Sequence, residues 1–291
     1  MADPYAANAR FVAPAGDGGP PRRLVFAAIA IDISWFVAAG TALSLLPLGA
    51  AQGTSRVGLI FGLLFFVVLM GITAIAARRL HNRRFLSLFG NFDRLLPDMV
   101  RVAIACLALG ITLALMAGWD TSTFTTRPLL PWLTFLPFVI FALMVQCLAE
   151  EVLYRGYLYQ QCAALLKSRA LWMLVPAIWF GLAHYDPALP ANEGWAYVVW
   201  ASALGLACAD LTARTGSIGA AWGMHLANNI LAICLFAEKD GQWSAAALFL
   251  TPATDLTAAA SSDPAAIWIG TGYDLAILAI TWLAARNAIA R

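Results

Sequence analysis

The apolar run FVIFALMVQCLA, residues 138–149, leads directly into EEVLYRGYLYQQ, residues 150–161. The second segment begins with two adjacent carboxylates, Glu150 and Glu151, and Arg155 follows one helical turn later. Such a run is typical of a helix in a membrane, where an ionisable side chain costs roughly 3 kcal/mol and therefore needs a partner, water or a chemical role. The fold depends on whether this run spans a membrane, and the function depends on what the carboxylates do there.

The composition of the whole chain indicates a membrane protein. Of 291 residues, 62% are hydrophobic and 12% are charged, whereas about 25% of residues are charged in ordinary soluble domains. Mean hydropathy is +0.76. The net charge of +2 is small and no basic patch is visible, so a nucleic-acid partner is not expected. The five cysteines stand singly, without a CxxC pair, and we interpret them as small core residues.

Eight apolar segments are candidates for membrane-spanning helices, each of which needs about 20 residues. They cover residues 24–48, 57–77, 99–118, 129–152, 171–185, 195–213, 217–236 and 264–286. The pattern predicts an all-α transmembrane bundle of about eight spans, forming a single integral membrane domain over residues 23–291. Residues 1–22 are rich in Ala, Gly and Pro and are predicted to be a disordered tail.

Arginines mark alternate ends of these segments. Arg22 and Arg23 precede the first span, and five further arginines fill the connection between the second and third spans. Positively charged connections stay in the cytoplasm. With eight spans, both termini are therefore predicted to be cytoplasmic, in a protein of the cytoplasmic (inner) membrane that is surrounded by lipid.

Several polar residues lie inside the apolar segments. His184 stands in PAIWFGLAHY, and His225 stands in WGMHLANNIL with Asn228 and Asn229. Taken singly, each has a structural reading, because polar side chains also join neighbouring membrane helices. Taken together with the carboxylate at Glu150, they occur on three spans, and we predict that they form one shared polar site.

Spacing separates the two carboxylates. Residues four apart lie on one face of a helix, so Glu151 and Arg155 are predicted to form an ion pair. Glu150 points about 100° away from that pair. Arg155 would then neutralise and orient Glu151, while Glu150 remains free to do chemistry. The alternative is a solvated helix end without a chemical role.

Three motifs stand in order on separate spans. They are Glu150-Glu151-x-x-x-Arg155, Phe180-x-x-x-His184 and His225-x-x-x-Asn229. In this order they resemble the motifs of the CPBP intramembrane protease family, which includes CAAX-type endopeptidases and bacterial members linked to bacteriocin maturation or self-immunity. The resemblance covers about residues 148–230. It implies a protease core at about 129–236 and cleavage near the C-terminus of a membrane-associated protein or peptide, which is lipid-modified in the CAAX case.

Peptide hydrolysis needs an activated water, a donor to the oxyanion and a proton for the leaving amine. Glu150 is the candidate base, because a carboxylate withdrawn from bulk water is a competent general base. The resemblance gives Glu150 the same role, and gives His184 that of holding the water or shuttling a proton. His225 and Asn229 are candidate donors to the oxyanion. The supporting positions are Glu151, Arg155, Phe180 and Asn228.

The depth of Glu150 depends on how far its helix extends. Glu150 ends a full-length apolar run, whereas a rise of about 1.5 Å per residue places His184 roughly 20 Å above the start of its span. The apolar and aromatic residues between positions 153 and 158 predict that the fourth span continues as a long tilted helix. Glu150 would then lie deeper in the membrane.

No obligatory metal is expected, although a divalent ion such as zinc is an alternative. Glu150, His184 and His225 are of the types that ligate catalytic zinc. The sequence has no HExxH motif, and each of these ligands would come from a different span. Family members resembling this chain have been described both as metalloproteases and as metal-independent glutamate proteases.

Other functions stay open at this point. The two histidines could ligate a haem in an electron carrier, the polar cluster could relay ions in a transporter, or the chain could be a catalytically silent scaffold or immunity protein. Three more intramembrane carboxylates, Asp32, Asp210 and Asp274, are interpreted first as structural. Cavity lining and substrate contact are their alternatives.

Overall fold

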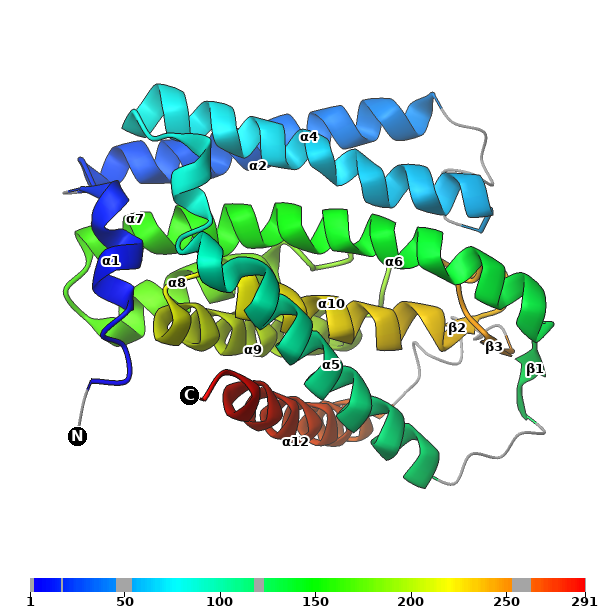
Figure 1. The fold of residues 1–291 in the computed structure, drawn as a ribbon. Helices are drawn as coiled ribbons and strands as arrows, with labels where there is room; N and C mark the ends of the chain where they lie inside the picture. The colour runs from blue at the N-terminus through cyan, green and yellow to red at the C-terminus, as the bar shows by residue number, and fades with distance from the viewer. Residues whose placement is uncertain (1–2, 17, 46–53, 118–122, 253–262, 291) are drawn as a thin grey trace.

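The computed structural model describes residues 3–16, 18–45, 54–117, 123–252 and 263–290. The longer helices are α2 (Pro21–Ser44), α4 (Arg56–His81), α5 (Phe92–Met116), α6 (Leu129–Glu151), α8 (Arg169–Leu182), α9 (Ala191–Thr215), α10 (Gly219–Cys234) and α12 (Pro264–Ile289). They run side by side as a bundle, with α2 and α4 on one side of α6 and with α9, α10 and α12 on the other (Figure 1). The predicted all-α transmembrane bundle is confirmed.

Six helical segments are long and apolar enough to cross a membrane. They are Pro21–Ser44, Arg56–His81, Phe92–Met116, Leu129–Leu165, Ala191–Thr215 and Pro264–Ile289. The other two predicted spans are also helical but shorter, at 14 residues for α8 and 16 residues for α10. The chain is an integral membrane protein, and the count of about eight spans is approximate. Residues 46–48 and 118, which end the first and third predicted spans, lie outside the described residues.

The fourth predicted span continues well beyond residue 152. After α6 the chain forms a π-helical segment, η4 (Val152–Tyr159), and then α7 (Gln160–Leu165). The combined helix of 37 residues is about 55 Å long at 1.5 Å per residue, whereas the hydrocarbon core is about 30 Å thick. All eight residues of η4 are buried. The predicted continuation is therefore correct, and the carboxylates lie inside the bundle.

The N-terminal segment differs from the predicted disordered tail. Residues Asn8–Val12 form α1, and Ala13–Ala15 form the 3-10 helix η1. Phe11 is only 2% exposed, and its ring centroid lies 5.9 Å from that of Tyr159. The Ala-, Gly- and Pro-rich composition conceals two aromatic anchors, Tyr5 and Phe11, whose burial holds the segment. Residues 1, 2 and 17 of the predicted tail lie outside the described residues.

A small sheet, which hydropathy did not predict, closes one end of the bundle. It has the order β1-β3-β2 and contains β1 (Thr125–Thr126), β2 (Phe236–Glu238) and β3 (Phe249–Thr251). β1 pairs antiparallel with β3, and β2 pairs parallel with β3. The sheet lies at the end of the molecule opposite both termini (Figure 1).

Glycines let α10 and α8 approach their neighbours closely. A Cβ added at Gly223 would overlap the backbone oxygen of Met99 on α5, and one added at Gly181 would overlap the Ser202 side chain on α9. Small residues at such crossings allow backbone contact, which is how membrane helices associate. These two crossings fix α10, which carries His225, and α8, which ends two residues before His184.

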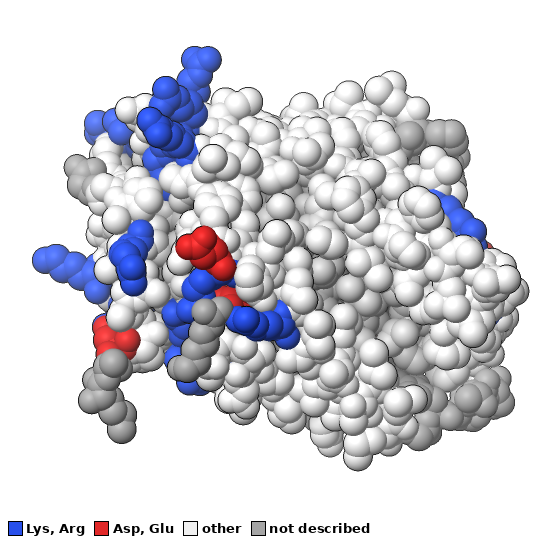
Figure 2. All heavy atoms as spheres, viewed as in Figure 1, with Lys and Arg blue, Asp and Glu red and all other residues white. Residues whose placement is uncertain are grey.

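Charge is distributed unevenly along the bundle. Lys and Arg side chains gather at the end where the termini lie, and a broad uncharged surface follows (Figure 2). Arg78, Arg79, Arg214 and Arg286 stand in the last turns of their helices at this end. The cytoplasmic location of this end stays a prediction that rests on the same asymmetry.

Candidate active site

A buried polar chain joins three helices at the middle of the bundle. Arg155 donates from Nη1 to Glu151 Oε1 at 3.0 Å and from Nη2 to the backbone oxygen of Gly205 at 3.1 Å. The same Glu151 oxygen lies 2.9 Å from Nδ1 of His225. Arg155 is 2% exposed and Glu151 is fully buried. The predicted Glu151–Arg155 ion pair is therefore present, and it also holds His225.

Glu150 lies next to the network of Arg155, Glu151 and His225 but does not join the Glu151–Arg155 ion pair. Its Oε2 atom is 3.5 Å from Nε2 of His225, within ion-pair distance but outside hydrogen-bonding geometry. The residue is 7% exposed, and Oε2 has no hydrogen-bond partner among the described residues. Glu150 lies about 22 Å from the end of its helix at Leu165, at 1.5 Å per residue. A buried carboxylate oxygen without a donor is costly and points to a group that receives its partner from outside the protein.

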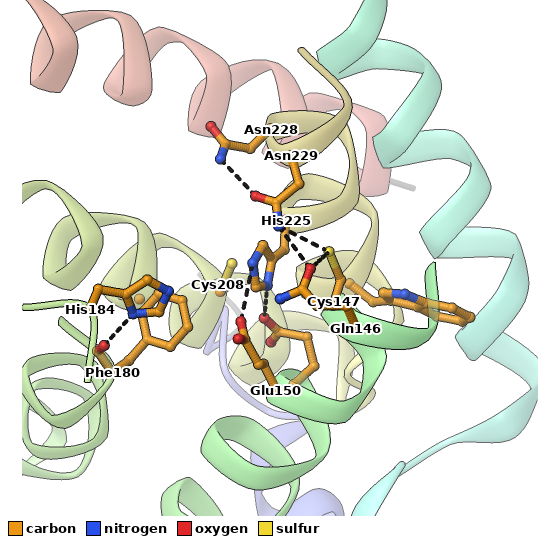
Figure 3. Close-up of polar contacts among 12 residues, drawn as sticks. Gln146, Cys147, Glu150, Phe180, His184, Cys208, His225, Asn228 and Asn229 are labelled. Atoms are coloured by element: carbon orange, nitrogen blue, oxygen red, sulfur yellow. Dashed lines mark hydrogen bonds and ion pairs between the residues drawn. The ribbon is translucent and has the colours of Figure 1, made fainter. Parts of the chain in front are cut away.

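The contacts of His225 fix its tautomer. Because Glu151 accepts a hydrogen bond from Arg155, it is held as a carboxylate and can only accept, so Nδ1 of His225 donates to it. In the neutral ring, Nε2 is then unprotonated and faces Glu150. One proton held by either Nε2 or the Glu150 carboxyl would remove the repulsion between their lone pairs, although at 3.5 Å the two atoms are not hydrogen-bonded. Figure 3 shows His225 with both ring nitrogens directed at the two carboxylates.

His184 occupies the other side of Phe180. Its Nδ1 lies 2.7 Å from the backbone oxygen of Phe180, and a carbonyl only accepts, so Nδ1 carries the proton and Nε2 is an acceptor. The Phe180 ring contacts both imidazoles, 4.4 Å from His184 and 5.7 Å from His225 by ring centroids (Figure 3). The Arg155 guanidinium stacks 4.7 Å from the same ring. Phe180 thus packs beside the site as predicted and contacts both histidines.

A set of amides adjoins the carboxylates on the side away from His184. Asn229 donates from Nδ2 to Gln146 Oε1 at 3.0 Å, and Asn228 donates to Asn229 at 3.1 Å (Figure 3). Gln146 was not among the predicted site residues. It stands four residues before Glu150 in an apolar helix, so the i,i+4 spacing that linked Glu151 to Arg155 would have found it.

These groups line one cavity of about 970 Å³. Its walls come from α2, α4, α6, η4, α8, α9, α10 and α12, and from the turn between β2 and β3. Its polar lining residues are Asp32, Gln146, Glu150, His184, Glu193, His225, Asn228, Asn229, Gln242, Thr271 and Asp274. The cavity therefore contains all four predicted catalytic residues. α2 packs mainly on α4, whereas α12 packs mainly on α5 and α9. The cavity therefore lies between two walls, one containing α2 and the other α12, that do not pack extensively on each other.

Asp210, unlike Asp32 and Asp274, is absent from the described cavity lining. It accepts hydrogen bonds from Tyr5 at 2.6 Å and Trp282 at 2.9 Å, and it pairs with Arg214 at 2.8 Å. This network ties the N-terminal segment and α12 to the end of α9. The structural interpretation of Asp210 agrees with these contacts.

The donors around the cavity do not fit the metal site considered for Glu150, His184 and His225. Within the described ranges, no group of three His, Cys, Asp or Glu residues lies close enough to share a metal ion. Both nitrogens of His225 already face carboxylates, and Nδ1 of His184 lies 2.7 Å from the Phe180 carbonyl oxygen. A catalytic zinc needs three protein ligands and an open position, and Glu150, His184 and His225 do not provide that arrangement.

Comparison with known proteins shows which family this part of the chain is similar to. Residues 131–231 match the family model described as type II CAAX prenyl endopeptidase Rce1-like. The chain therefore contains an Rce1-like domain, as the three motifs predicted, and this domain holds all eight predicted site residues. The uncharacterized protein YyaK of Bacillus subtilis (strain 168) is 31% identical over 97 residues, which is 33% of this chain and 32% of YyaK. No solved structure gives a significant match.

Proposed function

We propose that this protein is an intramembrane endopeptidase that hydrolyses a peptide bond in a membrane-associated protein or peptide, near the C-terminus as the family description implies. The observation that carries the proposal is the unpartnered Oε2 of Glu150, 3.5 Å from Nε2 of His225 in a cavity of about 970 Å³. A water in that cavity adjoins a base and an imidazole at once.

Glu150 is the general base. It takes a proton from a water molecule as the water oxygen attacks the scissile carbonyl carbon. The tetrahedral intermediate carries a negative oxygen, which His225 stabilises from Nε2 once that nitrogen holds a proton. The C–N bond then breaks, and the proton on Glu150 passes to the leaving amine. Water is consumed, and a carboxylic acid and an amine are formed.

The neighbouring residues orient this pair. Glu151 and Arg155 hold the His225 ring through Nδ1. Asn229 donates from Nδ2 to Gln146 Oε1 and to the weak acceptor Cys147 Sγ, and the hydrogen on the sulfur is the one that can turn to the oxyanion. His184, with an acceptor Nε2, holds the attacking water or relays its proton. Phe180 and Asn228 position these groups.

We also propose that no metal is obligatory, that the basic end of the bundle faces the cytoplasm, and that the protein works in the inner membrane. A haem carrier is disfavoured, because an axial ligand needs a free ring nitrogen and both nitrogens of His225 face carboxylates. A silent scaffold would not need an unpartnered buried carboxylate beside an oriented imidazole.

The test is cleavage of a library of membrane-associated peptides by purified protein in lipid nanodiscs, with and without a chelator. Glu150→Gln preserves the shape but removes the base, so product formation should fall by at least about 10²-fold, the usual range for a general base. Asp186→Asn is the matched control, because Asp186 is exposed, does not line the described cavity, and keeps its acceptor oxygen for Ala188. Unchanged cleavage by Glu150→Gln would remove the proposal, and loss of activity with chelator would restore the metal.

A further inference from the structure

The cavity is lined by carboxylates that the proposed chemistry does not use. Asp32 on α2, Glu193 on α9 and Asp274 on α12 all line it together with Glu150. Asp32 lies about 16 Å along its helix from Pro21, and Asp274 about 22 Å from Ile289 along its own, at 1.5 Å per residue. Both are therefore near the middle of membrane-spanning helices, where a carboxylate requires a partner or water.

These carboxylates have no cationic partner in the described part of the chain. Asp32 accepts one hydrogen bond, from Trp179 Nε1 at 2.8 Å, and neither Asp274 nor Glu193 has a hydrogen bond or ion pair there. Asp274 is exposed to the cavity, and Asp32 is half-buried. No Lys or Arg occurs among the described lining residues. The charge of the wall is thus not balanced from within the described protein.

Two further features indicate a ligand rather than solvated acids. Glu150, only 7% exposed, lines the same cavity, and its buried Oε2 atom has no hydrogen-bond partner among the described residues. Aromatic rings also line the wall, including Trp35 beside Asp32 and the stacked pair Tyr197 and Trp200. Aromatic faces together with carboxylates are the surroundings that bind organic cations. A volume of about 970 Å³ lies at the upper end of the roughly 300–1,000 Å³ typical of ligand pockets.

We propose that the cavity selects a peptide with a positively charged side chain close to the scissile bond, and that Asp32 and Asp274, on opposite walls, are the specificity-determining residues. This inference rests on the proposed function for its cleavage readout. A lysine or arginine side chain in the cavity would offset the negative charge of the carboxylates that line it. A glutamate at the same place, or a free terminal carboxylate, would be repelled. Membrane depth strengthens this selection, because charges are poorly screened away from bulk water.

Binding tests the inference without turnover. Three fluorescein-labelled peptides, identical except for Lys, norleucine or Glu at one position next to the scissile bond, are titrated by anisotropy with the Glu150→Gln protein in phosphatidylcholine nanodiscs. The position is scanned over the four residues around the bond. At the best position, the Lys peptide should bind at least about tenfold more tightly than the norleucine peptide, an order that one desolvated charge pair readily supplies. The Glu peptide should bind most weakly.

Variants locate the selection. Asp274→Asn and Asp32→Asn should each reduce the Lys-to-norleucine ratio, and the double variant should bring it close to one. Asp93→Asn is the matched control, because Asp93 is an exposed carboxylate on α5 outside the described lining, and the ratio should stay unchanged. The comparison of the three peptides uses the Glu150→Gln protein and needs no aspartate variant. The proposal can therefore still be refuted if the double variant does not fold.

The outcomes separate this inference from the proposed function. Equal binding of the Lys and norleucine peptides at every position, absence of peptide binding, or a ratio that survives the double variant would each overturn the cation site. A clear preference in binding without cleavage by the unsubstituted protein would retain the cation site and refute the peptidase. Cleavage with the same Lys preference in kcat/KM supports both.

Discussion

Nδ1 of His225 lies 2.9 Å from Oε1 of Glu151, and this contact turns Nε2 of the same ring toward Glu150. Glu151 therefore holds the imidazole at Nδ1 by a hydrogen bond, and the adjacent Glu150 lies 3.5 Å from its other nitrogen. Because residues 150 and 151 point about 100° apart on an α-helix, their carboxylates approach the His225 ring from two directions. The adjacent carboxylates of this chain have different roles for that reason.

The first prediction concerns Glu151. Glu151→Gln keeps the shape, but the amide can turn its NH₂ group toward His225, so that Nδ1 accepts instead of donating and the ring can no longer carry protons on both nitrogens when the oxyanion forms. We expect kcat to fall by between about tenfold and thousandfold, with a smaller change in KM, as for other groups that orient a catalytic imidazole.

The pH dependence of kcat distinguishes a role of Glu151 in orienting His225 from a role in folding alone. If Glu151 sets the protonation of His225, the limb of the kcat profile that depends on the imidazole should move in Glu151→Gln protein. Asp186→Asn should leave both limbs in place, since Asp186 lies outside the described cavity lining. A uniform loss of activity at every pH, with an unchanged profile, would assign Glu151 to folding alone.

The second prediction concerns Arg155. This residue is 2% exposed and bridges Glu151 to the Gly205 carbonyl. Removing one member of a buried pair leaves the other charge uncompensated and costs about 3–5 kcal/mol. Arg155→Met should therefore lower the apparent unfolding temperature in detergent markedly.

Two comparisons make that measurement specific. Arg101→Met removes an arginine whose side chain is 51% exposed and lies 3.7 Å from the buried Asp98. Asp98 keeps its 2.6 Å contact with Arg94, so losing the half-exposed arginine should cost only about 1 kcal/mol or less. The double variant Glu151→Leu/Arg155→Met removes both charges, so it should be more stable than Arg155→Met alone. If all three variants melt together, the buried pair has no special weight.

Much of the site could be predicted from sequence because its signals are local. The i,i+4 spacing of Glu151 and Arg155 predicts their ion pair, and polar residues in apolar runs mark His184, His225 and Asn229. The all-α class follows from hydropathy alone. The aromatic and apolar residues after Glu150 also predict the long fourth helix correctly.

The missing parts depend on contacts between distant segments. The hydrogen bond between Glu151 and His225 joins residues 74 positions apart. No spacing rule within one helix reveals such a contact. Gln146 escaped notice although a local rule applied to it. The helical structure of residues 8–15 depends on the packing of two aromatic side chains, Tyr5 and Phe11, in a segment whose average composition indicates disorder.

The third prediction concerns Gly223, which sets the position of α10. An added methyl group would overlap the Met99 backbone oxygen, and backbone cannot move aside as a flexible side chain does. Gly223→Ala should cost about 1–3 kcal/mol, as overpacking usually does, and should displace His225 two residues further on. We expect loss of cleavage together with a lower unfolding temperature.

Gly71→Ala is the matched control for Gly223→Ala. It makes the same change in a membrane-spanning helix at a site where an added Cβ meets nothing within 4 Å. Alanine is favoured over glycine in a helix by about 1 kcal/mol, so Gly71→Ala should leave activity unchanged and should not lower the unfolding temperature. Equal effects of the two substitutions would contradict the role of the α5–α10 crossing.

The fourth prediction concerns Tyr5, which fastens the N-terminal segment to α9. Its hydroxyl donates to Asp210 at 2.6 Å. Burial, together with this hydrogen bond, raises the pKa of Tyr5 above its usual value of 10.0. The contribution of the phenol to stability is therefore complete below pH 10 and is lost as pH rises through the higher folded-state pKa. Tyr5→Phe removes the hydrogen bond at all pH values, so its unfolding temperature should lie below that of the unsubstituted protein at pH 8.

The difference between the two proteins should shrink above pH 10, because the unsubstituted protein then loses what Tyr5→Phe already lacks. Melting curves at pH 8 and at about pH 10.5 measure this. Tyr273→Phe is the matched control, because Tyr273 is 69% exposed and has no partner among the described residues. A gap that is the same at both pH values would show that Tyr5 stabilises the protein through packing of its ring, and that the hydrogen bond to Asp210 contributes little.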